Sequence, residues 1–423
     1  MAFGSLGLCD ELLKTVAEQG YTKPSPIQAE AIPVVLSQRD VMAVAQTGTG
    51  KTAGFTLPMV QLLSGGSSPQ ALHVHALVIT PTRELAAQVA DSVQNYSRHM
   101  NIRSMAVFGG VRIEPQIAQL KAGVDVLIAT PGRLIDLYNQ QAINFDQLEI
   151  LVLDEADRML DLGFIDDILC IQKLLPNKRQ TLMFSATFST EIKSLANGML
   201  NNPRLIEIPA TNSTVDSVKQ IIHPVDKTRK SEVLIHLIKK NKWHQVLVFS
   251  RTKKGADSLV LQLKDAGISA DSIHANRTQH ARTRTLEGFR NGNIAVLVAT
   301  DIAARGIDVN QLPCVVNFDL PYLAEDYVHR IGRTGRAGTS GLAVSLFSED
   351  ESKQLQSIER LIGRQFEGDI IPGFAPSERI KADSTDDEEY GNFEADPKPQ
   401  RRGQSQKRRS RGGNSSNRNR TPR

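Results

Sequence analysis

The chain is poor in cysteine and has no long apolar segment. Its 423 residues include three cysteines, Cys9, Cys170 and Cys314, which are far apart and form no metal-binding or disulfide spacing. No run approaches the roughly 18 apolar residues that a membrane-spanning helix needs. The first residues also lack the basic and apolar regions of a signal peptide. These absences predict a protein of the reducing cytoplasm with no membrane partner.

Acidic residues are absent from residues 398–423, which contain ten Lys or Arg. The chain has 50 basic and 46 acidic residues, so residues 1–397 hold 40 basic and 46 acidic residues, a net charge of −6. Beyond about Pro372 apolar residues become rare, and residues 383–396 are acidic. Such a composition cannot bury enough surface to fold. We predict a disordered tail at 373–423 whose basic end binds phosphate groups.

Short Val-, Ile- and Leu-rich runs recur along the chain, and each ends in polar residues followed by helical periodicity. They lie at 40–45, 76–79, 124–129, 150–153, 182–184, 245–249, 294–299, 315–318 and 343–347. This order is typical of parallel α/β sheets, in which ligands bind at the carboxyl ends of the strands. Residues 209–217 are polar and lack apolar periodicity. We therefore predict two α/β domains, at 1–208 and 218–372, joined by a linker at 209–217.

The segment Ala45–Thr52, with the sequence Ala-Gln-Thr-Gly-Thr-Gly-Lys-Thr, follows one of these runs and precedes a predicted helix. Gly48 and Gly50 allow the backbone to approach a polyphosphate, Lys51 reaches the outer phosphates, and the Thr52 hydroxyl is placed to ligate Mg²⁺. Ala45 stands where the G-x-x-x-x-G-K-[ST] pattern has its first glycine, and alanine is small enough for that position. The segment predicts a phosphate-binding loop.

The sequence Asp-Glu-Ala-Asp at 154–157 directly follows the apolar run 150–153. A carboxylate at a strand end can hold Mg²⁺, partly through water, and an adjacent one can orient and deprotonate an attacking water. We assign the metal to Asp154 and the general base to Glu155. A solvated acidic turn is the alternative, and it fits poorly after four consecutive apolar residues.

The second half has no Gly-Lys-Thr, but it has the basic sequence His-Arg-Ile-Gly-Arg-Thr-Gly-Arg at 329–336. A basic run is often only a solvated surface. Opposite a domain with a phosphate loop, Arg333 and Arg336 are better interpreted as arginine fingers, which stabilise charge on the transferring phosphoryl group.

Taken in order, these motifs resemble those of DEAD-box RNA helicases, and in phrasing those of the bacterial RhlE-type subgroup. The resemblance covers residues 3–372. Its motifs lie at Phe3 with 20–28, 45–52, 81–85, 109–110, 130–133, 154–157, 185–187, 248–251, 279–282, 300–308 and 329–336. Two positions depart from the family pattern, because Tyr21 stands where Phe is commoner and Ala275 where Gly is usual.

The resemblance implies two RecA-like domains with ATP at their interface and single-stranded RNA across both. Gln28 would read the adenine edge and Phe3 would stack on the base, in agreement with the lack of an Asn-Lys-x-Asp guanine motif. The implied nucleotide-binding residues are Phe3, Tyr21, Gln28, Thr47, Gly48, Thr49, Gly50, Lys51, Thr52 and Asp308. The implied RNA-backbone contacts are Pro81, Thr82, Arg83, Gly110, Thr130, Arg133, Arg251, Arg282 and Thr300. Ser185, Thr187 and His329 would couple hydrolysis to strand separation.

The expected activity is local, non-processive unwinding of RNA duplexes and ribonucleoprotein, driven by ATP with Mg²⁺ and with ribosome-assembly or RNA-decay proteins as possible partners. ATP and RNA would together hold the two domains closed, because each ligand touches both. The sequence leaves three alternatives open: an ATP-dependent RNA clamp or assembly platform, a DNA helicase, and a phosphate-loop ATPase that acts on protein.

Overall fold

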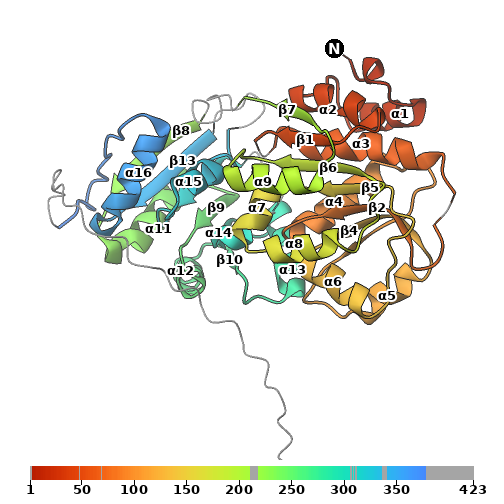
Figure 1. Cartoon of the computed structure of the whole chain (residues 1–423). Helices are drawn as coiled ribbons and strands as arrows, with labels where there is room; N and C mark the ends of the chain where they lie inside the picture. Colours follow the sequence, from red (N-terminus) through yellow and green to blue (C-terminus); the bar gives the residue numbers. More distant parts are fainter. Residues whose placement is uncertain are drawn as a thin grey trace, which may run out of the picture. The chain divides into compact units, whose positions relative to one another are not determined.

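The computed structural model describes residues 2–46, 48–67, 69–209, 218–304, 307, 309, 312–335 and 341–377. These residues form a seven-stranded sheet with the order β3-β4-β2-β5-β6-β1-β7 and a six-stranded sheet with the order β10-β11-β9-β12-β13-β8 (Figure 1). We call the first sheet with its helices lobe 1 and the second with its helices lobe 2. Every strand pair in both sheets is parallel.

The strands are short, as expected for sheets that are covered on both faces. In lobe 1 they are β1 (Val41–Val44), β2 (Val74–Ile79), β3 (Ser104–Val107), β4 (Val124–Ala129), β5 (Ile150–Leu153), β6 (Gln180–Ser185) and β7 (Arg204–Glu207). In lobe 2 they are β8 (Val218–Pro224), β9 (Val246–Phe249), β10 (Ala270–Ile273), β11 (Val296–Ala299), β12 (Cys314–Asn317) and β13 (Gly341–Phe347).

Helices alternate with the strands along both lobes. Those of lobe 1 are η1 (Phe3–Leu6), α1 (Asp10–Glu18), α2 (Pro26–Leu36), α3 (Lys51–Ser64), α4 (Arg83–Tyr96), α5 (Glu114–Leu120), α6 (Pro131–Asn139), α7 (Ala156–Asp161), α8 (Ile165–Gln172) and α9 (Thr190–Met199). Those of lobe 2 are η2 (Lys227–Arg229), α11 (Lys230–Asn241), α12 (Lys253–Asp265), α13 (Gln279–Arg290), α14 (Asp301–Ala304), α15 (Ala324–Ile331), η3 (Glu349–Glu351) and α16 (Ser352–Ile362).

Each sheet separates two apolar cores, because successive strand residues point to opposite faces. In β1, Val41 and Ala43 pack with α1 to α4, whereas Met42 and Val44 pack with the core that includes α6 to α9. In lobe 2, one face of the sheet packs against α11 and α12 and the other against α13 and α14. The predicted architecture of two parallel α/β domains is confirmed.

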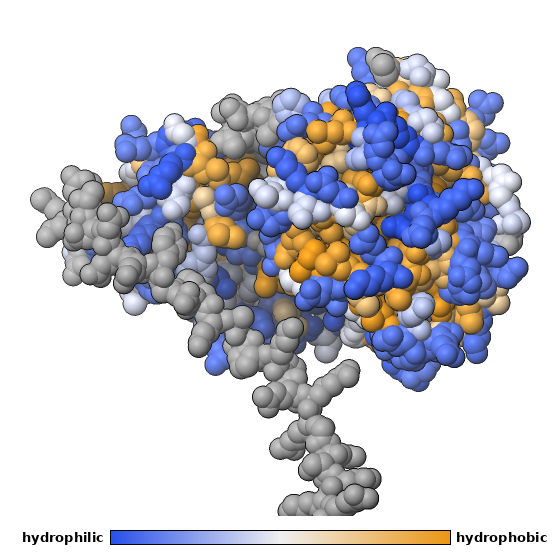
Figure 2. Space-filling model, viewed as in Figure 1, coloured by the Kyte–Doolittle hydropathy of each residue, from blue (hydrophilic) through white to orange (hydrophobic). Residues whose placement is uncertain are grey.

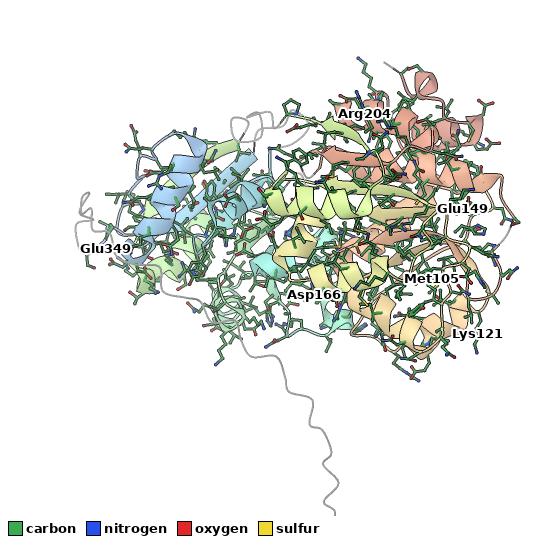
Figure 3. All side chains as sticks on the ribbon, viewed as in Figure 1. Met105, Lys121, Glu149, Asp166, Arg204 and Glu349 are labelled. Atoms are coloured by element: carbon green, nitrogen blue, oxygen red, sulfur yellow. The ribbon has the colours of Figure 1, made fainter. Side chains whose placement is uncertain are left out.

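The four strands that the sequence analysis missed are the four edge strands, β3, β7, β8 and β10. Edge strands are less buried and tolerate polar residues, so they form no continuous apolar run. In β7, for example, Ile206 is the one buried residue, and Arg204 is exposed (Figure 3). Each predicted central strand is present, with boundaries that differ by up to two residues.

Hydrophilic and apolar residues are interspersed over the face drawn in Figure 2. None of the helices in the described residues has the length and apolar composition that crossing a bilayer requires. The predicted linker at 209–217, apart from Pro209, and the predicted tail beyond Ser377 lie outside the described residues. The domain boundaries therefore stay a prediction.

Candidate functional site

The phosphate loop connects β1 to α3, as its sequence predicts. Gly48 and Gly50 have φ angles of 79° and 93°, which side chains other than glycine rarely adopt. A Cβ atom at Gly50 would also overlap the side-chain nitrogen of Gln28. The positive φ angle is therefore the main reason why residue 50 is glycine, and a side chain there would also displace the Gln28 amide. Thr47 lies outside the described residues.

Gln28 holds the phosphate loop to the start of α2. Its Nε2 donates to the Gly50 carbonyl at 3.2 Å, and its Oε1 accepts from the Ser25 N–H at 3.0 Å. Ser25 and Gln28 form a capping box, a pattern that serine followed by glutamine three residues later can signal. The sequence analysis gave Gln28 only a base-reading role and missed this one.

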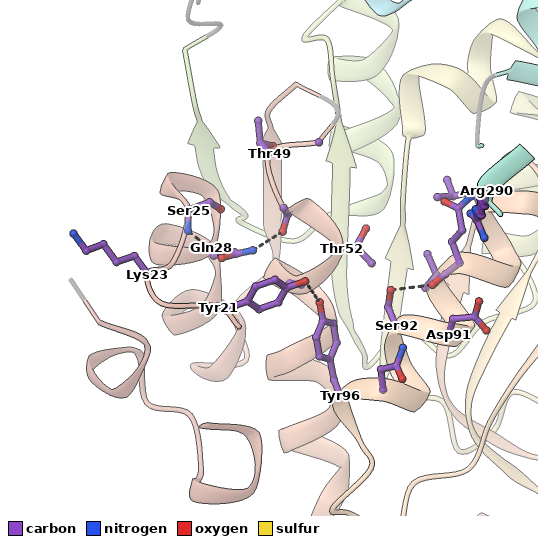
Figure 4. Close-up of a pocket in the computed structure, with 17 residues that line it drawn as sticks. Tyr21, Lys23, Ser25, Gln28, Thr49, Thr52, Asp91, Ser92, Tyr96 and Arg290 are labelled. Atoms are coloured by element: carbon purple, nitrogen blue, oxygen red, sulfur yellow. Dashed lines mark hydrogen bonds between the residues drawn. The ribbon is translucent and has the colours of Figure 1, made fainter. Parts of the chain in front are cut away.

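A hollow of about 620 Å³ lies beside Gln28 and the loop, and its size suits a small-molecule ligand (Figure 4). Its lining includes Tyr21, Gln28 and Thr52, together with Thr49, Gly50 and residues of α4. The Tyr21 hydroxyl lies 3.2 Å from that of Tyr96, whose pKa is raised by burial. Phe3 is buried against Tyr21, with 6.5 Å between the ring centroids.

Asp154 is the buried carboxylate of this region, with 2% of its surface exposed at the end of β5. Burial raises the pKa of Asp154 to about 7, the charge of Glu155 adds to this, and Lys51 opposes it. The Lys51 ammonium donates to the Ala45 carbonyl at 2.8 Å. A buried carboxylate gains from a neighbouring cation, and carboxylate and hydroxyl oxygens are ligands that Mg²⁺ prefers. Asp154 and Thr52 therefore fit a magnesium site.

Glu155 has a strained backbone, with φ 55° and ψ 54° in the left-handed region. Such conformations in non-glycine residues occur often at functional sites. Its carboxylate lies 3.4 Å from Nη1 of Arg158, one turn into α7.

Asp157 connects the acidic motif to the end of β6. Its Oδ2 accepts from the backbone N–H groups of Ala186 and Thr187, at 3.0 and 3.1 Å. The Thr187 N–H also lies 3.3 Å from Oγ of Ser185. The sequence analysis gave Asp157 no role of its own, because side-chain bonds to a distant backbone leave no sequence pattern.

The basic motif of lobe 2 lies on α15 and in the turn after it. Nη1 of Arg333 donates to the Ile307 carbonyl at 3.0 Å, and His329 Nδ1 lies 3.8 Å from Asp326. A small hollow is lined by Arg158 of lobe 1 together with His329 and Arg333 of lobe 2. Arg336 and Asp308, the other predicted residues of this region, lie outside the described residues.

Arg330, in the same motif, is buried and forms hydrogen bonds within lobe 2. It is 2% exposed, and its guanidinium binds both oxygens of Asp301, at 2.6 and 2.7 Å, and Oδ1 of Asn317 at 3.1 Å. These bonds connect α15 to the start of α14, where Thr300 and Asp301 lie. The sequence analysis proposed only Arg333 and Arg336 as fingers and gave Arg330 no role.

The RNA-binding candidates of lobe 1 follow β2, β3 and β4. Thr82 and Thr130 are the N-cap residues of α4 and α6, next to Pro81 and the Pro131–Arg133 turn. The Arg83 guanidinium packs onto Gly110, where φ is 78° and a Cβ atom would overlap it. Arg133 donates to the Gln116 side chain at 3.0 Å and to the Val111 carbonyl at 2.9 Å.

The candidates of lobe 2 make charged contacts with buried partners. Arg282 lies 2.9 Å from Glu84 of lobe 1, and Gln279 donates to the same carboxylate at 3.0 Å. Arg251 lies 2.7 Å from Glu351, and Thr300 is buried at the end of β11. The partners Glu84 and Glu351 were not predicted.

Comparison with known proteins agrees with this arrangement. The family profile described as DEAD/DEAH box helicase matches residues 25–195, and that described as helicase conserved C-terminal domain matches residues 229–338. The chain is 42% identical to "RNA helicase CrhR" of Synechocystis over 88% of this chain and 74% of that protein. It is 40% identical to "ATP-dependent RNA helicase RhlB" of Pseudomonas syringae, over 88% and 95%.

The chain belongs to the DEAD-box family of ATP-dependent RNA helicases. A solved structure of S. cerevisiae Dbp5 bound to RNA and ADP BeF3 is also similar, with a TM-score of 0.78 and 32% identity over 89% of this chain and 95% of that one. This helicase is therefore an RNA-stimulated ATPase that uses ATP to unwind RNA, as predicted. The RhlE-type subgroup stays a prediction.

Replacing Asp154 of the helicase by asparagine should stabilise lobe 1 in the absence of metal, and more at high pH. An unfolded aspartate titrates near 4 and the folded Asp154 near 7. Ionisation therefore destabilises the folded state increasingly between about pH 4 and pH 7, and fully above pH 7. At pH 8 we expect a gain on the order of 3 kcal/mol, or roughly 5–10 °C in the unfolding midpoint. Thermal unfolding in EDTA at pH 5 and pH 8 measures this, and a larger gain at pH 5 would contradict it.

Replacing Asp157 by asparagine should uncouple unwinding from hydrolysis. Asparagine keeps one acceptor oxygen but removes the charge that two backbone N–H groups share, and a hydrogen bond to a charged group contributes about 1.5–3 kcal/mol against about 0.5–1.5 kcal/mol for a neutral one. We expect duplex unwinding to fall about tenfold or more while RNA-stimulated ATP turnover stays within about threefold. Asp166→Asn, at an exposed aspartate in the first turn of α8 (Figure 3), is the matched control. An equal loss of both activities would show that Asp157 acts on the ATP site itself.

Proposed function

We propose that the hollow beside Gln28 takes the adenine of ATP and that the loop at 45–52 takes its phosphates. Gln28 would read the base edge, Tyr21 and Phe3 would give an aromatic surface, and Lys51 would exchange its bond to Ala45 for a phosphate oxygen. Thr52 and Asp154 would hold Mg²⁺, which neutralises charge on the phosphates when bound. The remaining nucleotide contacts would come from Thr47, Gly48, Thr49, Gly50 and Asp308.

Glu155 would orient and deprotonate the attacking water. Its position next to the buried Asp154, in a backbone conformation that directs its side chain differently from a helical residue, supports this role. Arg333, and Arg336 from the same motif, would stabilise the charge that develops on the phosphoryl oxygens. The hollow shared by Arg158 and Arg333 supports a site built from both lobes.

RNA would lie across the carboxyl ends of the strands in both lobes. The candidates in lobe 1 are Pro81, Thr82, Arg83, Gly110, Thr130 and Arg133, and those in lobe 2 are Arg251, Arg282 and Thr300. The contact of Arg282 with Glu84 supports a path that runs from one lobe to the other. Ser185, Thr187 and His329 would transmit the state of the nucleotide to the RNA.

The unwinding would be local and non-processive, because closure of the lobes bends a bound strand and hydrolysis reopens them. Domains at 1–208 and 218–372 would be the moving parts.

The basic segment 398–423 would add RNA affinity. A cytoplasmic location would suit the few cysteines, and ribosome-assembly or RNA-decay complexes would be the natural partners. The observation that carries the proposal is that Asp154 is buried at the end of β5, where its carboxylate experiences the charge of the phosphate-loop Lys51.

Replacing Glu155 by glutamine should abolish turnover and preserve ATP-dependent RNA binding. Glutamine keeps the size of the side chain and removes its basicity, and general-base catalysis contributes about 10²–10⁴-fold in rate. Steady-state ATP hydrolysis and RNA binding with and without ATP measure the two effects. Glu149→Gln, at an exposed glutamate before β5 (Figure 3), is the matched control. Normal hydrolysis by the Glu155 variant would refute the assignment of the base.

Removing the charge of residues 398–423 should weaken RNA binding and flatten its salt dependence. Each lost phosphate contact reduces the slope of log K against log salt by about 0.7 for single strands. Basal ATP turnover without RNA should not change. The variant has the ten basic residues replaced by serine and glutamine, which keeps the length of the chain. An unchanged salt slope would show that residues 398–423 do not bind RNA phosphates.

A further inference from the structure

Tyr322 is the most exposed large hydrophobic or aromatic side chain among the described residues, at 64%. It lies in the segment between β12 and α15, and its ring packs against the guanidinium of Arg251, with 4.9 Å between the ring centroid and Cζ. Exposed aromatic rings that lie on a fixed cation are suited to stacking, because the ring offers a flat apolar surface and the cation holds it.

Arg251 is held in place by hydrogen bonds to Asp319, Leu320 and Glu351. Its Nη2 lies 2.7 Å from Oε1 of Glu351 and 3.4 Å from the Leu320 carbonyl, and its backbone N–H donates to Asp319 at 2.7 Å. Glu351 is 1% exposed and also binds Lys230 at 2.5 Å. Nε of Arg251 is buried and has no hydrogen-bond partner among the described residues. The contacts with Glu351 and Leu320 therefore hold the guanidinium in place beneath the exposed ring.

The strand order places Tyr322 beside the proposed RNA path. β9 lies between β11 and β12, and Phe249 pairs with Ala299 on one side and with Asn317 on the other. Arg251 follows β9, Thr300 follows β11, and Tyr322 follows β12, so all three lie at the same edge of the sheet. A strand that passes Thr300 and Arg251 in this direction reaches Tyr322 next.

We infer that Tyr322 stacks on a nucleobase of the bound RNA strand. Base–aromatic stacking tolerates any base, because every base has a flat π face, and it strengthens binding by roughly fivefold or more per base. The contact would add an interaction with a nucleobase to a path that otherwise contacts only the RNA backbone. The inference rests on the proposed role of Arg251 in RNA binding. The alternative is that Tyr322 only keeps Arg251 in position.

A double-mutant cycle between the protein and the RNA distinguishes stacking by Tyr322 from a role in positioning Arg251. The full chain and its Tyr322→Ala variant are titrated with a labelled single-stranded RNA and with a series of the same RNA, each with one abasic nucleotide, with a non-hydrolysable ATP analogue present. Stacking predicts that Tyr322→Ala weakens binding of the intact RNA by about fivefold or more. It also predicts that at one abasic position the variant and the parent bind equally well, because the partner base is already gone.

Control variants test whether the effect requires an aromatic ring at residue 322. Tyr322→Phe should retain the full affinity, whereas Tyr322→Leu, which keeps an apolar contact with Arg251, should not. Tyr138→Ala removes an exposed tyrosine from α6 of lobe 1 and should have no effect. A 5-iodouridine placed at the sensitive position of the RNA should photo-crosslink to Tyr322, which requires no variant to fold.

The outcomes distinguish this inference from the proposal on which it rests. If Tyr322→Ala costs the same factor with every abasic RNA, or if no crosslink forms at Tyr322, stacking is wrong and the residue only positions Arg251. If Arg251→Ala leaves RNA affinity unchanged as well, the RNA path across lobe 2 is itself wrong. Loss with Arg251→Ala and none with Tyr322→Ala overturns the stacking inference alone.

Discussion

Parallel strand pairing is the constraint on which the arrangement of this helicase depends. Because all paired strands in each sheet run the same way, their carboxyl ends lie at one edge. In lobe 1 the phosphate loop follows β1, Asp154 follows β5, and Ser185 ends β6, so residues distant in the sequence become neighbours. β6 pairs with both β5 and β1, which places the acidic motif beside the phosphate loop. The same geometry in lobe 2 brings Thr300, Arg251 and Tyr322 to one edge.

Function at such an edge has an electrostatic cost. Asp154 is buried next to Glu155, and burial raises the pKa of Asp154, so its ionised form is disfavoured in the folded protein. In lobe 2, the buried charges of Glu351 and Arg330 have partners of opposite charge. Glu351 is surrounded by Lys230 and Arg251, and Arg330 is bonded to Asp301, so these charges are paired within the protein. The difference agrees with a site in lobe 1 that a cation completes and a lobe 2 that presents pre-positioned arginines.

The central strands and the motifs of the site could be predicted from the sequence. The edge strands and the contacts that support the site could not, for physical reasons. The central strands of both sheets are continuous apolar runs, and the motifs that follow them mark the ATP and RNA candidates. The edge strands β3, β7, β8 and β10 mix polar with apolar residues, so periodicity could not find them. The supports of the site were also missed. Asp157 binds backbone amides, and Glu351 binds Arg251 from 100 residues away, and neither contact leaves a local pattern.

We propose that the ATP site is completed only when RNA brings both lobes into contact with the nucleotide. The most direct measurement is the rate of ATP turnover by the full chain at saturating ATP, without nucleic acid, with a long single-stranded RNA, and with single-stranded DNA of the same sequence. Arginine fingers supplied on closure contribute roughly 10³–10⁵-fold, so we expect RNA to raise turnover by at least about tenfold and DNA to raise it far less. Equal turnover with and without RNA would contradict the account.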